Sequence, residues 1–141
     1  MTLDTMTISE YKRKRSPAPT EHHEQAELFR LAMLHSRRCP ALRMLYAIPN
    51  GANKSRAARA KFQREGLRAG IPDLQLAAAR GGYHGLYIEM KRAKGGVLSL
   101  EQLAWHEALR AEGYRVEVCR GADAAWGVLC DYLGITNEKE I

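Results

Sequence analysis

The sequence predicts an α/β fold in which a central mixed sheet of about four strands is flanked by helices. Segments with helical and with strand-like hydrophobic periodicity alternate along the chain. Residues 86–120 read as a strand–helix–strand unit, which favours a parallel strand pair joined by a right-handed crossover. The length of 141 residues suits one compact domain and is too short for two ordinary ones.

Hydrophobic periodicity and turn signals define the individual elements. Helices are predicted over residues 21–36, 55–65, 99–112 and 122–133. Strands are predicted over residues 43–48, 73–78, 86–91 and 115–120. The second helix is expected to direct Ala57, Ala58 and Phe62 inward and its basic residues outward. In strand 86–91 the even-numbered residues Leu86, Ile88 and Met90 point one way, and Tyr87, Glu89 and Lys91 point the other.

Charge is distributed unevenly along this basic chain, whose net charge is +6. Residues 28–70 contain ten basic residues and one acid, whereas residues 101–141 contain eight acids and four bases. Such clustering is typical of a phosphate-backbone footprint, and a solvated surface is the alternative. Residues 1–20 lack hydrophobic periodicity and are expected to form a flexible basic tail. The ordered domain is then expected over residues 21–134, with a C-terminal tail over 135–141.

The cysteines and the apolar segments indicate the cellular compartment in which the protein is expected. Cys39, Cys119 and Cys130 are odd in number and widely spaced, so they form neither a disulfide framework nor a zinc motif. No run of 18 apolar residues exists, and the N-terminus lacks the apolar region of a secretory signal. We expect a reduced, cytoplasmic protein with buried thiols.

Three polar residues carry the strongest chemical signal. Glu89 and Lys91 are two residues apart on one strand, so their side chains leave the same face, and Asp73 begins a neighbouring strand. Two acids from adjacent strands can hold a hard divalent cation such as Mg²⁺. The cation makes its bound water a better nucleophile, and a nearby lysine can neutralise charge that develops on a phosphate. Taken singly, each residue is more typical of a solvated face, an ion pair or a turn.

The combination of motifs in order is similar to a known family. The series is Gly70-Ile71-Pro72-Asp73-Leu74, Tyr87-Ile88-Glu89-Met90-Lys91 and Ser99-Leu100-Glu101-Gln102. This series resembles the VRR-NUC family of the PD-(D/E)XK nuclease superfamily. The resemblance spans roughly residues 21–133 and includes His23-Glu24-Gln25 and the Ile48-Pro49-Asn50-Gly51 turn. It implies a restriction-endonuclease-like fold with a central mixed four-stranded sheet.

The resemblance also implies roles for individual residues. Asp73 and Glu89 would bind Mg²⁺ or Mn²⁺, joined by the backbone carbonyl of Met90, and Lys91 would be the catalytic lysine. Glu24 matches a helix-borne acid near the metal, and Gln102 matches a polar residue that faces the active site. From the residues alone, Glu24 is equally an exposed first-turn acid favoured by the helix dipole. Gln102 is likewise the N3 residue of a capping box with Ser99.

Five residues are candidates for contacts with nucleic acid. Asn50, Lys54 and Arg56 lie in and after a glycine-containing turn that precedes a basic helix, where a phosphate cradle is expected. Arg92 and Lys94 follow the catalytic strand and either contact phosphate or remain solvated.

The function expected from the resemblance is a metal-dependent DNA endonuclease that hydrolyses phosphodiester bonds. Short standalone members of bacteria and phages are linked with dimers and four-way-junction cleavage, so a homodimer acting on branched DNA is expected. Aromatic and leucine residues of the last two helices either form the dimer contact or close the monomer core, namely Trp105, Trp126, Leu129, Tyr132 and Leu133. The competing readings are a non-catalytic nucleic-acid-binding module and a structural phage protein.

Overall fold

The structure is a computed structural model, and it describes residues 19–51 and 54–140. The predicted basic tail over residues 1–20 therefore lies almost wholly outside the described residues. The elements in chain order are α2 (Glu21–Leu34), η1 (Pro40–Met44), β1 (Leu45–Ala47), α3 (Arg56–Arg64), β2 (Leu74–Leu76), β3 (Leu86–Lys91), α4 (Leu100–Ala111), β4 (Arg115–Arg120) and α5 (Ala122–Leu133).

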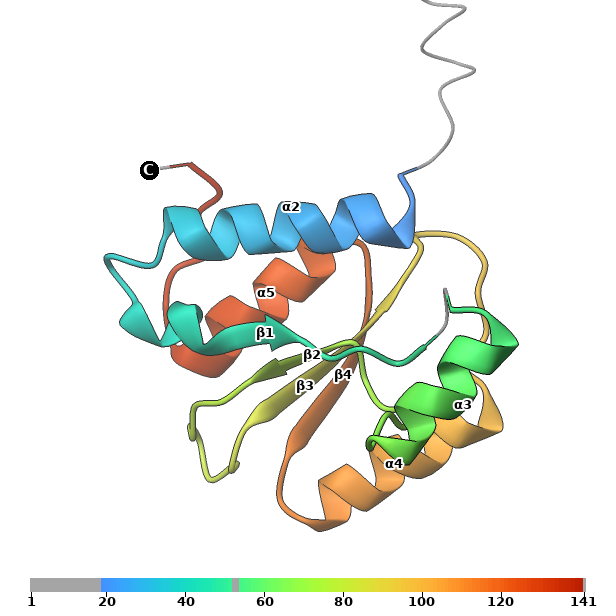
Figure 1. The fold of residues 1–141 in the computed structure, drawn as a ribbon. Coiled ribbons are helices and arrows are strands. Elements are labelled where there is room, and N and C mark those ends of the chain that lie inside the picture. Colours follow the sequence, from blue (N-terminus) through green and yellow to red (C-terminus); the bar gives the residue numbers. More distant parts are fainter. Residues whose placement is uncertain (1–18, 52–53, 141) are drawn as a thin grey trace, which may run out of the picture.

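The sheet has four strands in the order β1-β2-β3-β4 (Figure 1). The pairs β1–β2 and β2–β3 are antiparallel, and β3–β4 is parallel. Helix α4 makes the crossover between the two parallel strands, as the strand–helix–strand pattern predicts. The predicted α/β fold with a mixed four-stranded sheet is confirmed.

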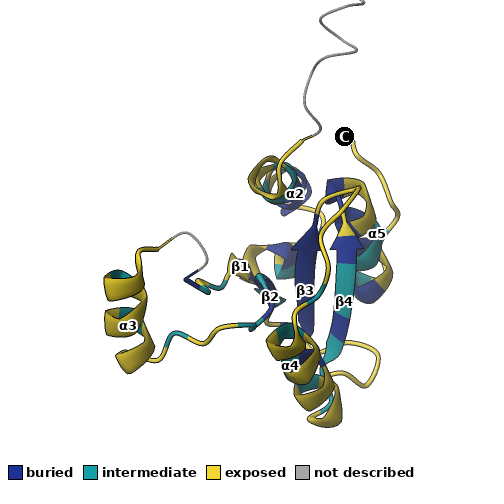
Figure 2. Cartoon of the chain, turned by 90° about the vertical axis from the view of Figure 1, so that its right-hand side faces the viewer, coloured by how far each residue is buried: buried dark blue, intermediate teal, exposed yellow. Residues whose placement is uncertain are grey.

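The main core lies between one face of the sheet and the helices α2 and α5, which pack against each other above it (Figures 1 and 2). The even-numbered residues of β3 point into this core, where they meet the apolar stripes of both helices. Each helix contributes fully buried side chains, among them Leu28 and Leu31 from α2 and Trp126 and Leu129 from α5. Burial of this much apolar surface is the main force that stabilises the fold.

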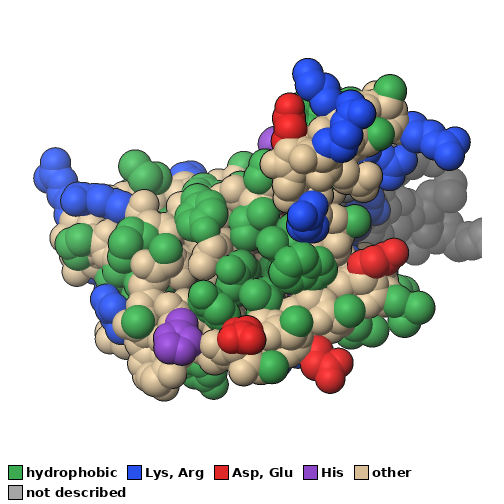
Figure 3. All heavy atoms as spheres, turned by 60° about the horizontal axis from the view of Figure 1, so that its bottom comes forward, with side chains coloured by type: hydrophobic (Ala, Val, Ile, Leu, Met, Phe, Trp, Pro, Cys, Tyr) green, Lys and Arg blue, Asp and Glu red, His purple; other side chains and the backbone are tan. Residues whose placement is uncertain are grey.

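The opposite face of the sheet is covered by α4 at one end only. A row of residues crosses this face, with Tyr46 of β1 beside Gln75 of β2 and Gln75 beside Tyr87 of β3. Figure 3 views the molecule from this side and shows hydrophobic side chains gathered at its centre. All six residues of β3 are nevertheless buried, so the alternation in its sequence separates two covered faces rather than a core face from a solvent face.

Two predicted strands are shorter than expected. The segment predicted as strand 43–48 begins with the last residues of the 3₁₀ helix η1, and only Leu45–Ala47 pair as a strand. Pro40 at the start of η1 favours this helical turn. The predicted strand 73–78 is confined to Leu74–Leu76 because β1, with which it pairs, has only three residues.

The expectation that α3 buries an apolar face is wrong. None of its residues is buried, and the helix stands away from the sheet (Figure 2). Ala57 is exposed, while Ala58 and Phe62 are only partly covered. The Lys54 ammonium lies over the Phe62 ring, 4.2 Å from its centroid. The lysine side chain thus shields part of a ring that the core leaves partly exposed.

The last helix closes the core of the protomer. Trp126, Leu129 and Tyr132 are buried within it, so they do not form an exposed patch for a second copy. The described part of the predicted C-terminal tail packs against the domain, with the Trp126 indole N–H donating to the Glu138 carbonyl at 3.0 Å. The three cysteines are buried free thiols, as expected. Within residues 19–51 and 54–140, no helix is long and apolar enough to cross a membrane.

Candidate active site

Asp73 and Glu89 face each other across two antiparallel strands. The pairing of Leu74 with Ile88 places Asp73, one residue before β2, opposite Glu89 of β3. Residues that lie directly opposite in an antiparallel pair point to the same face and come into contact. The structure thus brings together the two acids that the sequence singled out.

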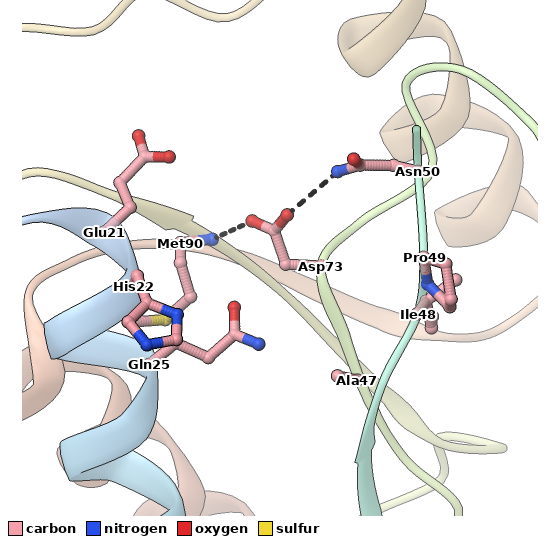
Figure 4. A pocket seen from close by; sticks show the side chains of 9 residues that line it. All are labelled: Glu21, His22, Gln25, Ala47, Ile48, Pro49, Asn50, Asp73 and Met90. Atoms are coloured by element: carbon pink, nitrogen blue, oxygen red, sulfur yellow. Dashed lines mark hydrogen bonds between the residues drawn. The ribbon is translucent and has the colours of Figure 1, made fainter. Parts of the chain in front are cut away.

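Two hydrogen bonds fix the Asp73 carboxylate (Figure 4). The backbone N–H of Met90 donates to Oδ2 at 2.8 Å, and the side-chain amide of Asn50 donates to Oδ1 at 3.2 Å. Asn50 was expected to contact phosphate, but in this structure its amide orients a catalytic candidate. Together the two bonds hold the Asp73 carboxylate in one orientation beside Glu89.

The chain reaches Asp73 through a close contact with α4. The Trp105 indole N–H donates to the carbonyl of Ala69 at 3.1 Å. Gly70 lies so near the first turn of α4 that an added Cβ would stand 2.7 Å from the Glu101 backbone, and its φ is +86°. Only glycine accepts both the positive φ and the approach. This explains physically why the Gly70-Ile71-Pro72-Asp73 motif begins with glycine.

Glu89 is buried to 1% exposure, which is unusual for a carboxyl group. Burial and then the neighbouring Asp73 carboxyl raise the pKa of Glu89 to about 9, and Lys91 acts against the rise. The cause is that a buried site disfavours the charged form and that two adjacent carboxylates repel each other. Without a cation, the pair holds a proton at neutral pH.

Lys91 and Gln102 are joined by a hydrogen bond. The Lys91 ammonium donates to Gln102 Oε1 at 3.3 Å, and the same oxygen accepts the backbone N–H of Ser99 at 2.9 Å. Ser99 in turn accepts the Gln102 backbone N–H, which completes the predicted capping box. Gln102 therefore serves the cap and the lysine through one oxygen, and the two roles expected as competitors coexist.

His106 lies one turn further along α4 and is also buried. Its Nε2 is 3.6 Å from Glu89 Oε1. Burial, followed by the positive charges of Arg110 and Lys91, lowers the pKa of His106. The ring is therefore neutral at neutral pH.

An open pocket of about 340 Å³ borders Asp73, between the start of α2 and the β1 strand end. Figure 4 shows Glu21, His22 and Gln25 of α2 on one side of it, facing Asp73 and Asn50 on the other. The negative charge of Glu21 contributes to the raised pKa of Glu89, so the two are electrostatically close. None of these α2 residues is among the site residues predicted from the sequence, and Gln25 appears there only within the motif series. The four-residue spacing of Glu21 and Gln25 places these two on one helix face.

Glu24 makes a different contact. Its Oε2 accepts the backbone N–H of Ala122 at 2.6 Å, the first residue of α5. Gly121, the N-cap residue of α5, has no side chain to provide this acceptor, so Glu24 caps α5 from a neighbouring helix. Its role near a metal stays a prediction.

The donor set suits a hard divalent cation. Within the described residues no group of three His, Cys, Asp or Glu side chains could hold a metal by itself. Two carboxylates and a backbone carbonyl are enough for Mg²⁺, which keeps several waters and uses substrate phosphates as further ligands. Asp73 and Glu89 repel each other when both are ionised, and Lys91 offsets this repulsion only in part, since the pKa of Glu89 is still raised to about 9. The residues therefore fit Mg²⁺ or Mn²⁺.

Basic residues border the site on two sides. On one side, Lys54 is exposed just before α3, which begins at Arg56. The residues of α3 are exposed or partly exposed. Figure 3 shows a group of Lys and Arg side chains over this helix. Arg92 and Lys94 are exposed in the loop after β3, whose carbonyls at Arg92 and Gly95 accept from the Arg120 guanidinium. The candidate phosphate contacts thus lie at the surface, except Asn50.

The fold and the paired acids with a nearby lysine define a nuclease-type α/β domain. The family model described as VRR-NUC domain matches residues 9–123 of the chain. A solved structure described as a VRR_NUC domain protein superposes with a TM-score of 0.69 at 30% identity, covering 85% of this chain and 93% of the other. No curated protein matches the chain significantly. The chain belongs to the VRR-NUC family.

The raised pKa of Glu89 predicts how stability depends on pH in metal-free protein. The folded state keeps a proton up to about pH 9, whereas the unfolded chain loses it near its ordinary pKa of 4.5. The unfolded state therefore binds fewer protons, and the free energy of unfolding falls as pH rises between these values. Glu89→Gln should remove this fall and raise Tm at pH 8 above that of the wild type, because no proton is then lost on unfolding.

Thermal unfolding followed by circular dichroism at pH 5 and pH 8, with EDTA present, measures the effect. Glu107→Gln, an exposed residue of the same helix as His106, is the matched control and should follow the wild type. If Tm changes between pH 5 and pH 8 by the same amount in Glu89→Gln as in the wild type, Glu89 is not a buried protonated carboxyl group.

The contacts of Glu21 and Glu24 predict that replacing each acid by alanine affects a different property of the protein. Glu24→Ala should lower the free energy of unfolding by about 0.5–2 kcal/mol, because α5 loses its capping acceptor. Glu21→Ala should change it by less than about 0.5 kcal/mol, because the side chain is exposed, and should reduce cleavage. Urea unfolding and a cleavage assay measure both. Loss of cleavage with unchanged stability in Glu24→Ala would instead place Glu24 in the catalytic site.

Proposed function

We propose that this protein is a Mg²⁺- or Mn²⁺-dependent DNA endonuclease that hydrolyses phosphodiester bonds. The observation that carries the proposal is the contact between Asp73 and Glu89, with Lys91 two residues further along the same strand face. Two acids placed side by side, one of them buried, are unfavourable for stability by themselves. A bound divalent cation would offset the repulsion between the two carboxylates, and Lys91 would then face a phosphate substrate.

Each member of the site has a role in this proposal. Asp73, Glu89 and the Met90 carbonyl would hold the cation, with Asn50 keeping the Asp73 carboxylate in place. The cation supplies a more acidic bound water and neutralises charge on the scissile phosphate. Lys91, oriented by Gln102, would neutralise the negative charge that develops on the phosphate as the P–O bond breaks.

The exposed bases support DNA backbone binding. Asn50 borders the active-site pocket, and Lys54 follows it closely in the chain, with its backbone N–H donating to the Gly51 carbonyl at 3.1 Å just before α3 begins at Arg56. Arg92 and Lys94 follow directly from the catalytic strand. Contacts of this kind position the duplex on the protein without reading its sequence. A structure-selective enzyme needs such contacts more than base-specific ones.

We further propose that the substrate is branched DNA, such as a four-way junction, and that the enzyme acts as a homodimer. Symmetric resolution of a junction needs two cuts, which a two-fold dimer supplies from equivalent sites. Of the α5 residues first considered for the contact, Trp126, Leu129 and Tyr132 are buried and Leu133 is half-buried. The partly open sheet face with Tyr46, which is 45% exposed, and the neighbouring α4 with Leu103, which is 47% exposed, offer apolar surface for the contact.

Removing the side chain of either Asp73 or Lys91 should strongly reduce DNA cleavage. Asp73→Ala and Lys91→Ala are each expected to reduce the rate by at least about 10²–10³-fold, because each removes electrostatic stabilisation of the transition state. Initial rates on a labelled four-way junction, a flap and a linear duplex with Mg²⁺, Mn²⁺ or EDTA measure the effect, with circular dichroism as a check of folding. Wild-type rates in either variant would overturn the assignment, and a wild type that binds DNA without cutting would favour a binding module.

Reversing two charges near the pocket should weaken DNA binding for all sequences alike. Lys54→Glu with Arg56→Glu should also lower the slope of log affinity against log salt by about 2, or about 1 per lost phosphate contact. Fluorescence anisotropy at several salt concentrations measures this. Arg43→Glu with Arg80→Glu makes the same change in net charge in η1 and in the turn between β2 and β3, segments that lie away from α3 (Figure 1), and should have a smaller effect. Equal losses in both variants would assign the effect to net charge alone.

The dimer predicts a mass of about twice the 15.8 kDa of one chain in solution. Light scattering at micromolar concentration measures the mass, and Tyr46→Lys with Leu103→Lys should shift it toward the monomer because charges would then be buried in an apolar contact. Lys substitution of Met33, an exposed residue of α2, is the control. A monomeric wild type that still resolves junctions would remove the paired-cut mechanism.

A further inference from the structure

Two buried polar atoms face each other on the side of Glu89 that is remote from solvent. His106 Nε2 and Glu89 Oε1 are 3.6 Å apart, and both residues are 1% exposed. Neither atom has a hydrogen-bond partner within the described part of the chain. Buried polar side-chain atoms are almost always satisfied in native proteins, so each such exception calls for an explanation.

The spacing along helix and strand shows how the pair arises. Gln102 and His106 are four residues apart on α4, a rise of about 6 Å along the helix axis. Lys91 and Glu89 are two residues apart on β3, a rise of about 6.5 Å along the strand. Because the two distances match, α4 presents Gln102 to Lys91 and His106 to Glu89. One helix face thus reaches both charged residues of the catalytic strand.

A distance of 3.6 Å is slightly too long for a hydrogen bond, and a small rotation of either side chain closes it. A neutral imidazole carries one N–H, and Nε2 is the nitrogen that faces the carboxyl group. Glu89 has two carboxyl oxygens, so an N–H on Oε1 leaves the other oxygen for the side of Asp73. Histidine in this position would set the direction in which Glu89 points.

We propose that His106 is a positioning residue, whose Nε2–H donates to Glu89 Oε1 and holds the carboxyl group toward Asp73, where the divalent cation of the proposed function is bound. Partners that orient a metal-ligating carboxylate commonly change metal affinity by 10–100-fold when they are lost. His106 touches neither the cation nor the DNA in this proposal. It acts only through Glu89.

The molecule contains a matched control for the loss of a buried histidine. His35 is 1% exposed, and its Nε2 likewise lacks a partner within the described residues. Its Nδ1 accepts from the Arg38 guanidinium at 2.8 Å, and its ring packs at 5.0 Å from Trp126, in the core of α2 and α5. Replacing His35 therefore perturbs a similar environment without a carboxylate in contact.

The test measures metal binding directly, by the free Mn²⁺ signal in electron paramagnetic resonance of the full-length protein. His106→Leu should weaken Mn²⁺ binding by about 10-fold or more. His106→Gln, which restores an N–H donor near the position of Nε2, should stay within about 3-fold of the wild type. His35→Leu should not change the affinity beyond about 2-fold. An unchanged affinity in folded His106→Leu, or an equal loss in His35→Leu, would overturn the proposal.

A second measurement keeps the proposal testable if His106→Leu does not fold. In wild-type protein labelled with ¹⁵N-histidine, the Nε2 resonance of His106 should shift on addition of Mg²⁺, and His35 should not respond. The shift should disappear in Glu89→Gln. A His106 resonance that is insensitive to Mg²⁺ in a wild type that binds Mg²⁺ and cuts DNA overturns this inference alone. A wild type with neither metal binding nor cleavage overturns the proposed function, and this inference with it.

Discussion

The proximity of two carboxyl groups, Asp73 and Glu89, is the constraint on which the rest of the structure depends. Their repulsion in a buried place works against folding, and the neighbouring elements offset it. Asn50 and the Met90 backbone satisfy Asp73, while Lys91 lowers the cost of the charge on Glu89. The β1 strand end, the β2–β3 pairing and α4 are all required to hold this one contact.

The fold was largely predictable because its signals are local and repeated. Alternation in residues 86–91, the Ser99 capping box and the strand–helix–strand unit together define β3, α4 and β4 in their observed order. The predictions failed where tertiary contacts decide. The apolar residues of α3 predict a buried face, but none of the residues of that helix is buried. The lengths of β1 and β2 depend on each other, which periodicity in either segment does not reveal.

The candidate site was predictable in its acids and lysine but not in their surroundings. Asp73, Glu89 and Lys91 come together as the strand pattern indicates. The positions of the helix acids follow from how α2 packs, which directs Glu24 to the first turn of α5 and Glu21 to the pocket. His106 is buried on the face of α4 that packs on the sheet. The contact between this helix face and Glu89 depends on how α4 is positioned along β3. The sequence of either element alone does not reveal that position.

The segment that carries α3 leaves the sheet after β1 and returns at Asp73, and its two ends are tied together where the Ile48 N–H donates to the Asp73 carbonyl at 2.7 Å. None of its helix contributes to the core. Loops closed in this way tolerate changes of length and sequence at little cost in stability. Evolution could therefore change the helix of this segment, which carries part of the proposed DNA contacts, while the acids and the lysine of the sheet stay in place.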